Sequence, residues 1–191
     1  AVEVENTLSV PITFEYEIEV NDGICSVHDT VLVTLNPLPT PQLNSEFSIC
    51  ADEEIELNPN ATGTFEWEPA SLFDDPGASI QIISPIDTVN ISVMVQNQWG
   101  CSGDASTTII VHPIPYPIFS MTSIEDCPPV VWSFALDTAS TNCDEVQWDF
   151  GTLGVFAGPE VSSIAYSSGI YACNLTVASN FGCEYALDLG N

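Results

Sequence analysis

The chain repeats one pattern three times, and this repetition constrains its fold more than any other feature. Each copy holds an alternating strand, a short turn with Asn or Gly, a cysteine and a second strand; the copies are Tyr16–Pro39, Ile91–Pro115 and Tyr171–Asn191. Their cysteines, Cys25, Cys101 and Cys183, lie 76 and 82 residues apart. A fixed period of this kind is typical of tandem modules. We therefore expect the C-terminal half of a module in 1–39, a complete module in 40–115 and a further module in 116–191 whose final strand is incomplete.

Alternation of apolar and polar residues marks the strands. From Ile12 to Val20 every second residue is apolar, and three of the four residues between them are Glu. This alternation is typical of a strand with one buried face. No segment has a helical period, and Pro, Gly, Asn and Asp separate the short strands. The expected fold class is all-β, as tandem β-sandwiches whose Pro-rich joints at 37–41 and 113–117 are stiff.

The charge balance excludes several partners. The 191 residues include 27 Asp and Glu and no Lys or Arg. Nucleic acids and anionic membrane surfaces are bound through Lys and Arg, so neither is expected as a partner. No apolar run approaches the roughly 20 residues that span a bilayer, so membrane insertion is not expected. A salt bridge within the chain needs His28 or His112, the two histidines.

The seven cysteines indicate an extracellular protein. They form no C-x-x-C pair and have only two histidines as companions, which is unlike a zinc site. Disulfides fit better, and they form in oxidising compartments. Because the number is odd, at least one cysteine is expected to bond outside this segment.

Enzymatic chemistry is not expected. The sequence has no G-x-S-x-G elbow and no glycine-rich phosphate loop, so we predict no catalytic residue and no cofactor. Calcium is the one ion whose oxygen chemistry suits so acidic a chain. The candidate ligands are clustered on predicted turns, at Asp52, Glu53, Glu54, Asp74 and Asp75.

One motif links the last module to a known family. Residues Gln147–Gly151 read QWDFG, which resembles the W-D-F-G signature of PKD domains. Cys127–Phe134 resembles the strand before that signature, and Tyr166–Tyr171 with Leu175–Val177 resembles the strand after it. Residues Phe65–Ala70 lie at the corresponding place in module 40–115. Where the family continues with an acidic turn residue, this chain has Thr152, which puts a loop-bound cation in doubt.

The resemblance implies immunoglobulin-like β-sandwiches and a cell-surface location. Tandem PKD-like repeats flanked by cysteines are similar to those of giant bacterial surface proteins exported by type IX secretion, among them gliding adhesins and attachment or grappling filaments. The aromatic residues at the motif positions are then expected in the sandwich cores: Trp67, Trp148, Phe150 and Tyr171.

An immunoglobulin-like topology also implies which cysteines can meet. Its second and penultimate strands run in the same direction, so Cys50 and Cys101 would lie at opposite ends of one module, beyond disulfide reach. For the last module we predict the bonds Cys127–Cys173 and Cys143–Cys183. Bonds between modules or between chains are then expected of Cys25, Cys50 and Cys101.

Taken together, these patterns favour a structural repeat segment of an extracellular filament or adhesin that mediates cell-surface attachment. Its expected partners are neighbouring modules of the same long chain and identical chains in a homo-oligomeric filament. Two alternatives stay open. One is a module that binds carbohydrate or a cell surface, and the other is a non-catalytic spacer of a secreted hydrolase.

Overall fold

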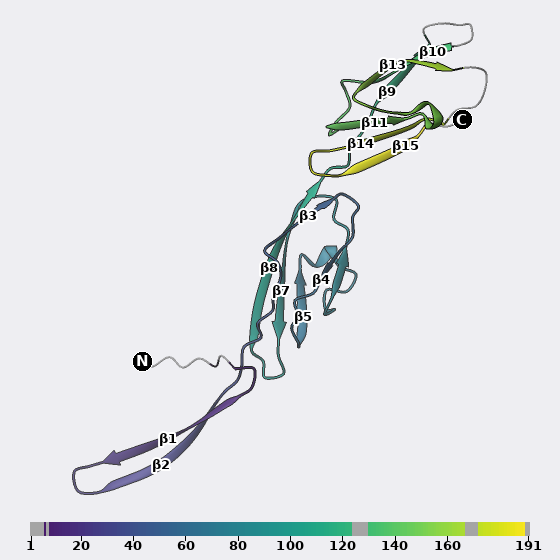
Figure 1. The fold of residues 1–191 in the computed structure, drawn as a ribbon. Coiled ribbons are helices and arrows are strands. Elements are labelled where there is room, and N and C mark those ends of the chain that lie inside the picture. Colours follow the sequence, from purple (N-terminus) through teal and green to yellow (C-terminus); the bar gives the residue numbers. More distant parts are fainter. Residues whose placement is uncertain (1–5, 7, 124–129, 167–171, 190–191) are drawn as a thin grey trace. The chain divides into compact units, whose positions relative to one another are not determined.

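The computed structural model describes residues 6, 8–123, 130–166 and 172–189 (Figure 1). In this part of the chain, regular structure is strand apart from two 3-10 turns, η1 (Ala70–Leu72) and η2 (Gly151–Leu153), so the all-β prediction is confirmed. None of the described residues belongs to a helix that is long and apolar enough to cross a membrane. Contacts between Cα atoms group the chain into two compact units. The first holds residues up to 47, 54–85 and 89–109, and the second holds 48–53, 86–88 and the residues from 110 onward.

The first unit begins with a two-stranded hairpin. Strands β1 (Ile12–Asn21) and β2 (Ser26–Leu35) pair antiparallel along their whole length, and no third strand of the described residues joins them (Figure 1). The Asp22 carboxylate accepts hydrogen bonds from the amides of Ile24 and Cys25, at 2.9 and 2.8 Å. These bonds, that of Cys25 first, lower the pKa of Asp22 and fix the turn.

The register of this hairpin separates its side chains into two faces. The face that we call the apolar hairpin face carries Ile12, Phe14, Tyr16, Ile18, Val20, Val27, Val31, Val33 and Leu35, with Asp29 among them. None of these nine apolar side chains is buried in the structure, and Val20 and Val27 are 66% and 67% exposed. The opposite face carries the Glu ladder, where Oε1 of Glu17 lies 3.0 Å from Nδ1 of His28.

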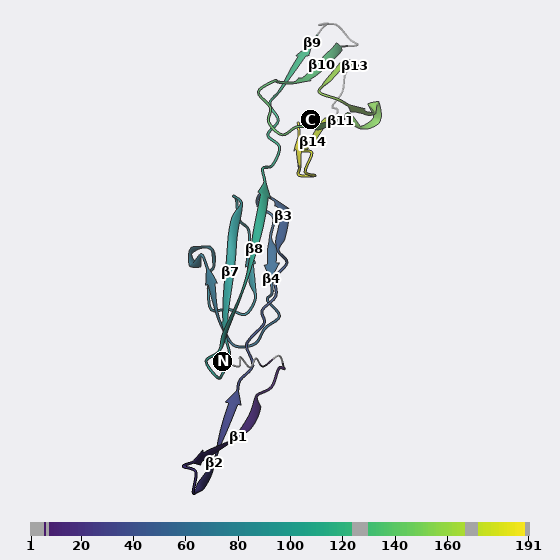
Figure 2. The same ribbon diagram turned by 90° about the vertical axis from the view of Figure 1, so that its left-hand side faces the viewer.

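Residues 46–112 form two sheets. The larger has the strand order β3 (Glu46–Cys50), β8 (Ser102–His112), β7 (Val89–Gln96), β5 (Thr64–Glu68), and the smaller pairs β4 (Ile55–Leu57) with β6 (Gln81–Ile83). Figure 2 shows β7 and β8 as long neighbouring strands. Both sheets contribute to one core, because Ile91, Val93 and Val95 of β7 are buried, as are Leu57 and Ile83.

The second unit contains the other sandwich. One sheet has the order β13 (Glu160–Tyr166), β10 (Val130–Leu136), β9 (Phe119–Ser123), and the other has the order β12 (Val155–Ala157), β11 (Glu145–Asp149), β14 (Asn174–Ala178), β15 (Glu184–Asp188). Its core draws Phe134 and Val161 from the first sheet and Trp148, Leu175 and Val177 from the second. A core that is fed from both sheets is the arrangement of a β-sandwich.

The aromatic residues predicted for the cores are deeply buried wherever the structure describes them. Trp67 and Trp148 are 0% exposed and Phe150 is 1% exposed, whereas Tyr171 lies outside the described residues. Each tryptophan donates its indole N–H to a carbonyl about ten residues further on, Trp67 to Ala78 at 2.8 Å and Trp148 to Gly158 at 3.1 Å. The two sandwiches therefore place their central tryptophan in the same way.

Among the described residues, strands pair only within 12–35, within 46–112 and within 119–188. The compact units are divided differently, because the second unit includes 48–53 and 86–88. The module boundaries at 39/40 and 115/116 therefore stay predictions.

Candidate functional site: a cross-linked turn

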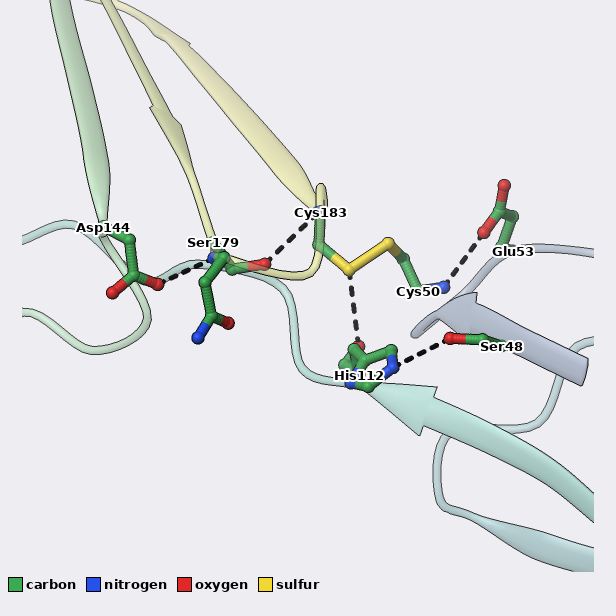
Figure 3. The surroundings of a disulfide bond; sticks show 8 residues. Ser48, Cys50, Glu53, His112, Asp144, Ser179 and Cys183 are labelled. Atoms are coloured by element: carbon green, nitrogen blue, oxygen red, sulfur yellow. Dashed lines mark hydrogen bonds between the residues drawn. A yellow bond between two sulfur atoms is a disulfide. The ribbon is translucent and has the colours of Figure 1, made fainter.

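The chemical feature that most distinguishes the second unit is a disulfide between Cys50 and Cys183 (Figure 3). Cys50 ends β3, and Cys183 closes the turn between β14 and β15. The bond joins residues 133 apart in sequence, with their Cα atoms 5.6 Å from one another. Cys183 is 1% exposed, so solvent reaches little of this end of the bond.

The turn that carries Cys183 is built by its own backbone. Ser179 N–H donates to the Cys183 carbonyl at 2.9 Å, and Gly182 N–H donates to the Ser179 carbonyl at 3.0 Å. Gly182 has a φ of +83°, which a glycine adopts without steric cost. Asp144 accepts a hydrogen bond from the amide of Asn180 at 2.8 Å and ties the turn to the start of β11.

The last residue of β8, His112, makes four contacts around the disulfide. Its ring stacks on Phe181 with centroids 3.9 Å apart. Its Nε2 lies 2.9 Å from Ser48 Oγ (Figure 3). Its carbonyl accepts the amide of Ala51 at 2.9 Å and lies 3.9 Å from Cys183 Sγ. Glu53 accepts the amide of Cys50 at 2.9 Å. These groups are engaged in holding the cross-link, so the arrangement is suited to mechanical connection.

The predicted bond Cys143–Cys183 is wrong, because Cys183 bonds Cys50. Cys143 lies just before β11, and its thiol instead lies 3.2 Å from the Thr141 carbonyl. Cys50 and Cys183 both belong to the second compact unit, so the predicted bond of Cys50 beyond its own module stays a prediction. Cys173 is a free thiol in the structure, and its predicted partner Cys127 lies outside the described residues.

The free thiols differ in environment. Burial raises the pKa of Cys173 to about 11, helped by the negative charges of Asp149 and Asp188. Burial also raises the pKa of Cys143, and the neighbouring Asp144 adds to the shift. Cys25 is exposed and Cys101 is partly exposed. Since the thiolate is the reactive form, the raised pKa values make Cys173 and Cys143 weakly reactive thiols.

The acidic clusters proposed for calcium make local contacts. Glu53 binds the Cys50 amide, as noted, and Asp75 accepts the amide of Gly77 at 2.9 Å. Within the described ranges, no three His, Cys, Asp or Glu side chains converge in a way that could hold a metal ion. The calcium hypothesis therefore stays a prediction, which titration calorimetry on the intact chain can test.

Sequence reasoning missed Phe181 and His112 as partners. The available signal was the repeat itself, since Phe181-Gly182-Cys183 matches Trp99-Gly100-Cys101.

No protein-family model matches the chain, and no curated protein matches it. Among solved structures, the chain is similar to the N-terminal eight Ig domains of Down Syndrome Cell Adhesion Molecule, with TM-score 0.52 and 13% identity over 99% of this chain and 36% of that one. It is also matched to the insect immune protein hemolin (TM-score 0.44, 10% identity, 91% and 54% covered) and to Sidekick-1 immunoglobulin domains 1–5 (0.37, 13%, 92% and 44%).

At 13% identity, the similarity to Down Syndrome Cell Adhesion Molecule shows the fold alone. The TM-scores of the other two structures are too low to support an argument. This chain spans between 36% and 54% of the length of these structures. The class of the protein follows: it is a tandem immunoglobulin-like, all-β chain.

Proposed function

We propose that the protein is a structural segment of an extracellular filament or adhesin that mediates cell-surface attachment. The finer assignment, a giant surface protein of the type IX-secreted kind, is supported by the resemblance of residues 147–151 to PKD domains. The chain shares its fold with the N-terminal Ig domains of Down Syndrome Cell Adhesion Molecule, whose name is in keeping with this role. In this proposal the chain has a mechanical task and no catalytic one.

The observation that carries the proposal is the Cys50–Cys183 bond. When a chain is pulled from its two ends, tension follows the shortest covalent path. That path crosses from Cys50 to Cys183 and bypasses the residues between them, which include β4 to β14 and both tryptophan cores. The bond therefore protects most of the folded strands from extension. It also supports an extracellular location, because disulfides persist in oxidising compartments.

Single-molecule stretching tests this role directly. With the disulfide intact, the segment between the two cysteines should contribute nothing to the length gained on unfolding. After reduction, or in Cys50→Ser, the 133-residue segment should add roughly 450 Å of extended chain. Cys25→Ser, which alters an exposed free thiol, is the matched control and should behave as the unmodified protein. Full extension of the oxidised protein would overturn the proposal.

A second candidate function, carbohydrate binding, is favoured by one observation. A shallow hollow of about 300 Å³ is lined by Trp99, which is 41% exposed, together with Leu38, Thr40 and Thr62. An exposed aromatic ring beside hydroxyl groups suits the stacking of a sugar. Binding on a glycan array that is lost in Trp99→Ala would establish this function, and an array without signal would remove it.

A further inference from the structure

The three hairpins of the repeat, β1–β2, β7–β8 and β14–β15, each turn through a glycine and a cysteine. The glycines Gly23, Gly100 and Gly182 have φ between +80° and +89°. The cysteine directly follows the glycine in the second and third turns, whereas Ile24 separates Gly23 from Cys25 in the first. In the second turn Asn97 N–H donates to Cys101 O at 3.0 Å, as Ser179 does to Cys183. The cysteine of the third turn is bonded, whereas Cys101 and Cys25 are free.

The third turn contacts the ends of two strands, and the second turn makes one of the two corresponding contacts. The third turn lies against the end of β8, at His112, and bonds the end of β3, at Cys50. The second turn lies against the end of β2, where the Asn97 side chain donates to the Pro37 carbonyl at 2.8 Å. Pro37 follows β2 as Pro113 follows β8. The contact with the first strand end is thus present, and a counterpart of Cys50 for Cys101 is absent from the described residues.

The hairpin β1–β2 lacks the same part of its module. In the equivalent hairpin β7–β8, strands β5 and β3 pair with the two outer edges, and the small sheet β4–β6 contributes to the core that buries Ile91, Val93 and Val95. The apolar hairpin face has the matching alternation but is exposed. An isolated two-stranded hairpin is marginal in water, and an apolar surface of this extent marks an interface.

In a second copy of this chain, the strands that the structure describes have no such part left unpaired. Its β3–β6 segment already pairs with its own β7–β8, and its β9–β13 segment forms one sandwich with its own β14–β15. The missing part is therefore a further segment of the β3–β6 type, in which the first strand ends in a cysteine.

We propose that Cys101 forms a disulfide with the cysteine that ends the first strand of a β3–β6-type segment outside residues 1–191, and that this segment covers the apolar hairpin face. In forming the bond, the two thiols release two protons and two electrons. The electrons pass by thiol–disulfide exchange to a disulfide-form oxidoreductase of the oxidising compartment, which leaves as the dithiol. The inference goes beyond the proposed function, since it holds whether the assembled protein bears load or binds a ligand.

The test maps disulfides in the protein from its native source. Free thiols are blocked with N-ethylmaleimide before denaturation, and the chain is cut with a protease specific for Asp and Glu, because it has no Lys or Arg. The expected result is an unblocked Cys101 joined to a peptide outside residues 1–191 that has strand alternation ending in cysteine. A blocked Cys101, or a bond to Cys25, Cys143, Cys173 or a second Cys101, would overturn the proposal.

Hydrogen exchange on the same native protein tests the covered face. The amides of β1–β2 should exchange as slowly as those of β7–β8, within about a factor of ten, and rapid exchange would refute the covering segment. Failure in either measurement leaves the stretching experiment on Cys50–Cys183 unaffected, so the two proposals stand or fall separately.

Discussion

Among the free cysteines, residue environment sets reactivity. Cys173 has a pKa of about 11 because it is buried and lies near two carboxylates, so roughly one molecule in a thousand carries the thiolate at pH 8. We expect iodoacetamide to label exposed Cys25 at pH 8 and to leave Cys173 unlabelled in the folded protein, as read by peptide mass spectrometry. Equal labelling of the two would contradict the buried placement.

The raised pKa of Cys173 also makes the stability of the fold depend on pH. Because the folded protein favours the protonated thiol, the contribution of this thiol to the free energy of unfolding is complete below the ordinary pKa of 9.0. That contribution is lost as the pH rises through about 11.

The two buried indole N–H groups give a second prediction at the residue scale. Trp148→Phe removes the donor to Gly158 and leaves a gap, which should lower the free energy of unfolding of the second unit by about 2–4 kcal/mol. Trp67→Phe should do the same to the first unit through Ala78. Chemical denaturation of both variants checks this, and a loss below about 1 kcal/mol in both would argue against the buried donors.

The core residues were predictable from sequence, and the pairing of the cysteines was not. Trp67 and Trp148 stand in alternating strands, where the period itself indicates the buried side. The partner of Cys183 depends on which strand end the turn meets, and local pattern does not encode that. A bond outside the module was expected for Cys101. The same expectation for the equivalent Cys183 would have made Cys50 a candidate partner.

At the scale of elements, neighbouring strands decide which hairpin is protected. Hairpin β7–β8 is paired on both edges, whereas no strand in the described part of the chain pairs with an edge of β1–β2. In the recombinant 191-residue chain, we expect the amides of β1–β2 to exchange with deuterium at least about 100-fold faster than those of β7. Comparable protection in the two hairpins would show that something already covers the apolar hairpin face.

Alternation predicted the long strand β1 well, because apolar and polar residues alternate along it over nine positions. Strand β1 was expected over Ile12–Val20 and is found over Ile12–Asn21. Short strands such as β4 and β12 have three residues each, too few for a period to be read. They exist because neighbouring strands pair with them.

At the scale of the whole molecule, one covalent bond closes a long loop. In the chain-entropy description, a loop of 133 residues contributes up to about 5 kcal/mol by restricting the unfolded chain. Cys50→Ser should therefore lower the melting temperature of the second unit clearly, and Cys183→Ser should match it, because either change removes the same bond. Calorimetry of both variants beside Cys25→Ser provides the check, and no change in either would contradict the bond.

The overall fold class follows from period and composition, whereas ligands do not. The acidic clusters were read as calcium sites because carboxylates lie close in sequence. In the structure Glu53 and Asp75 accept hydrogen bonds from amides of their own turns, and calcium binding by these clusters stays a prediction. Proximity in sequence does not determine whether oxygens converge.

The close approach between the chain after β2 and strand β8 depends on one missing side chain. A Cβ at Gly103 would collide with the carbonyl of Pro39 and touch Pro41, both on the proline-rich stretch. A single added methyl group at Gly103 would therefore push the proline-rich stretch away from β8. Gly103→Ala offers engineers a way to loosen that stretch while leaving every buried aromatic and every cysteine in place.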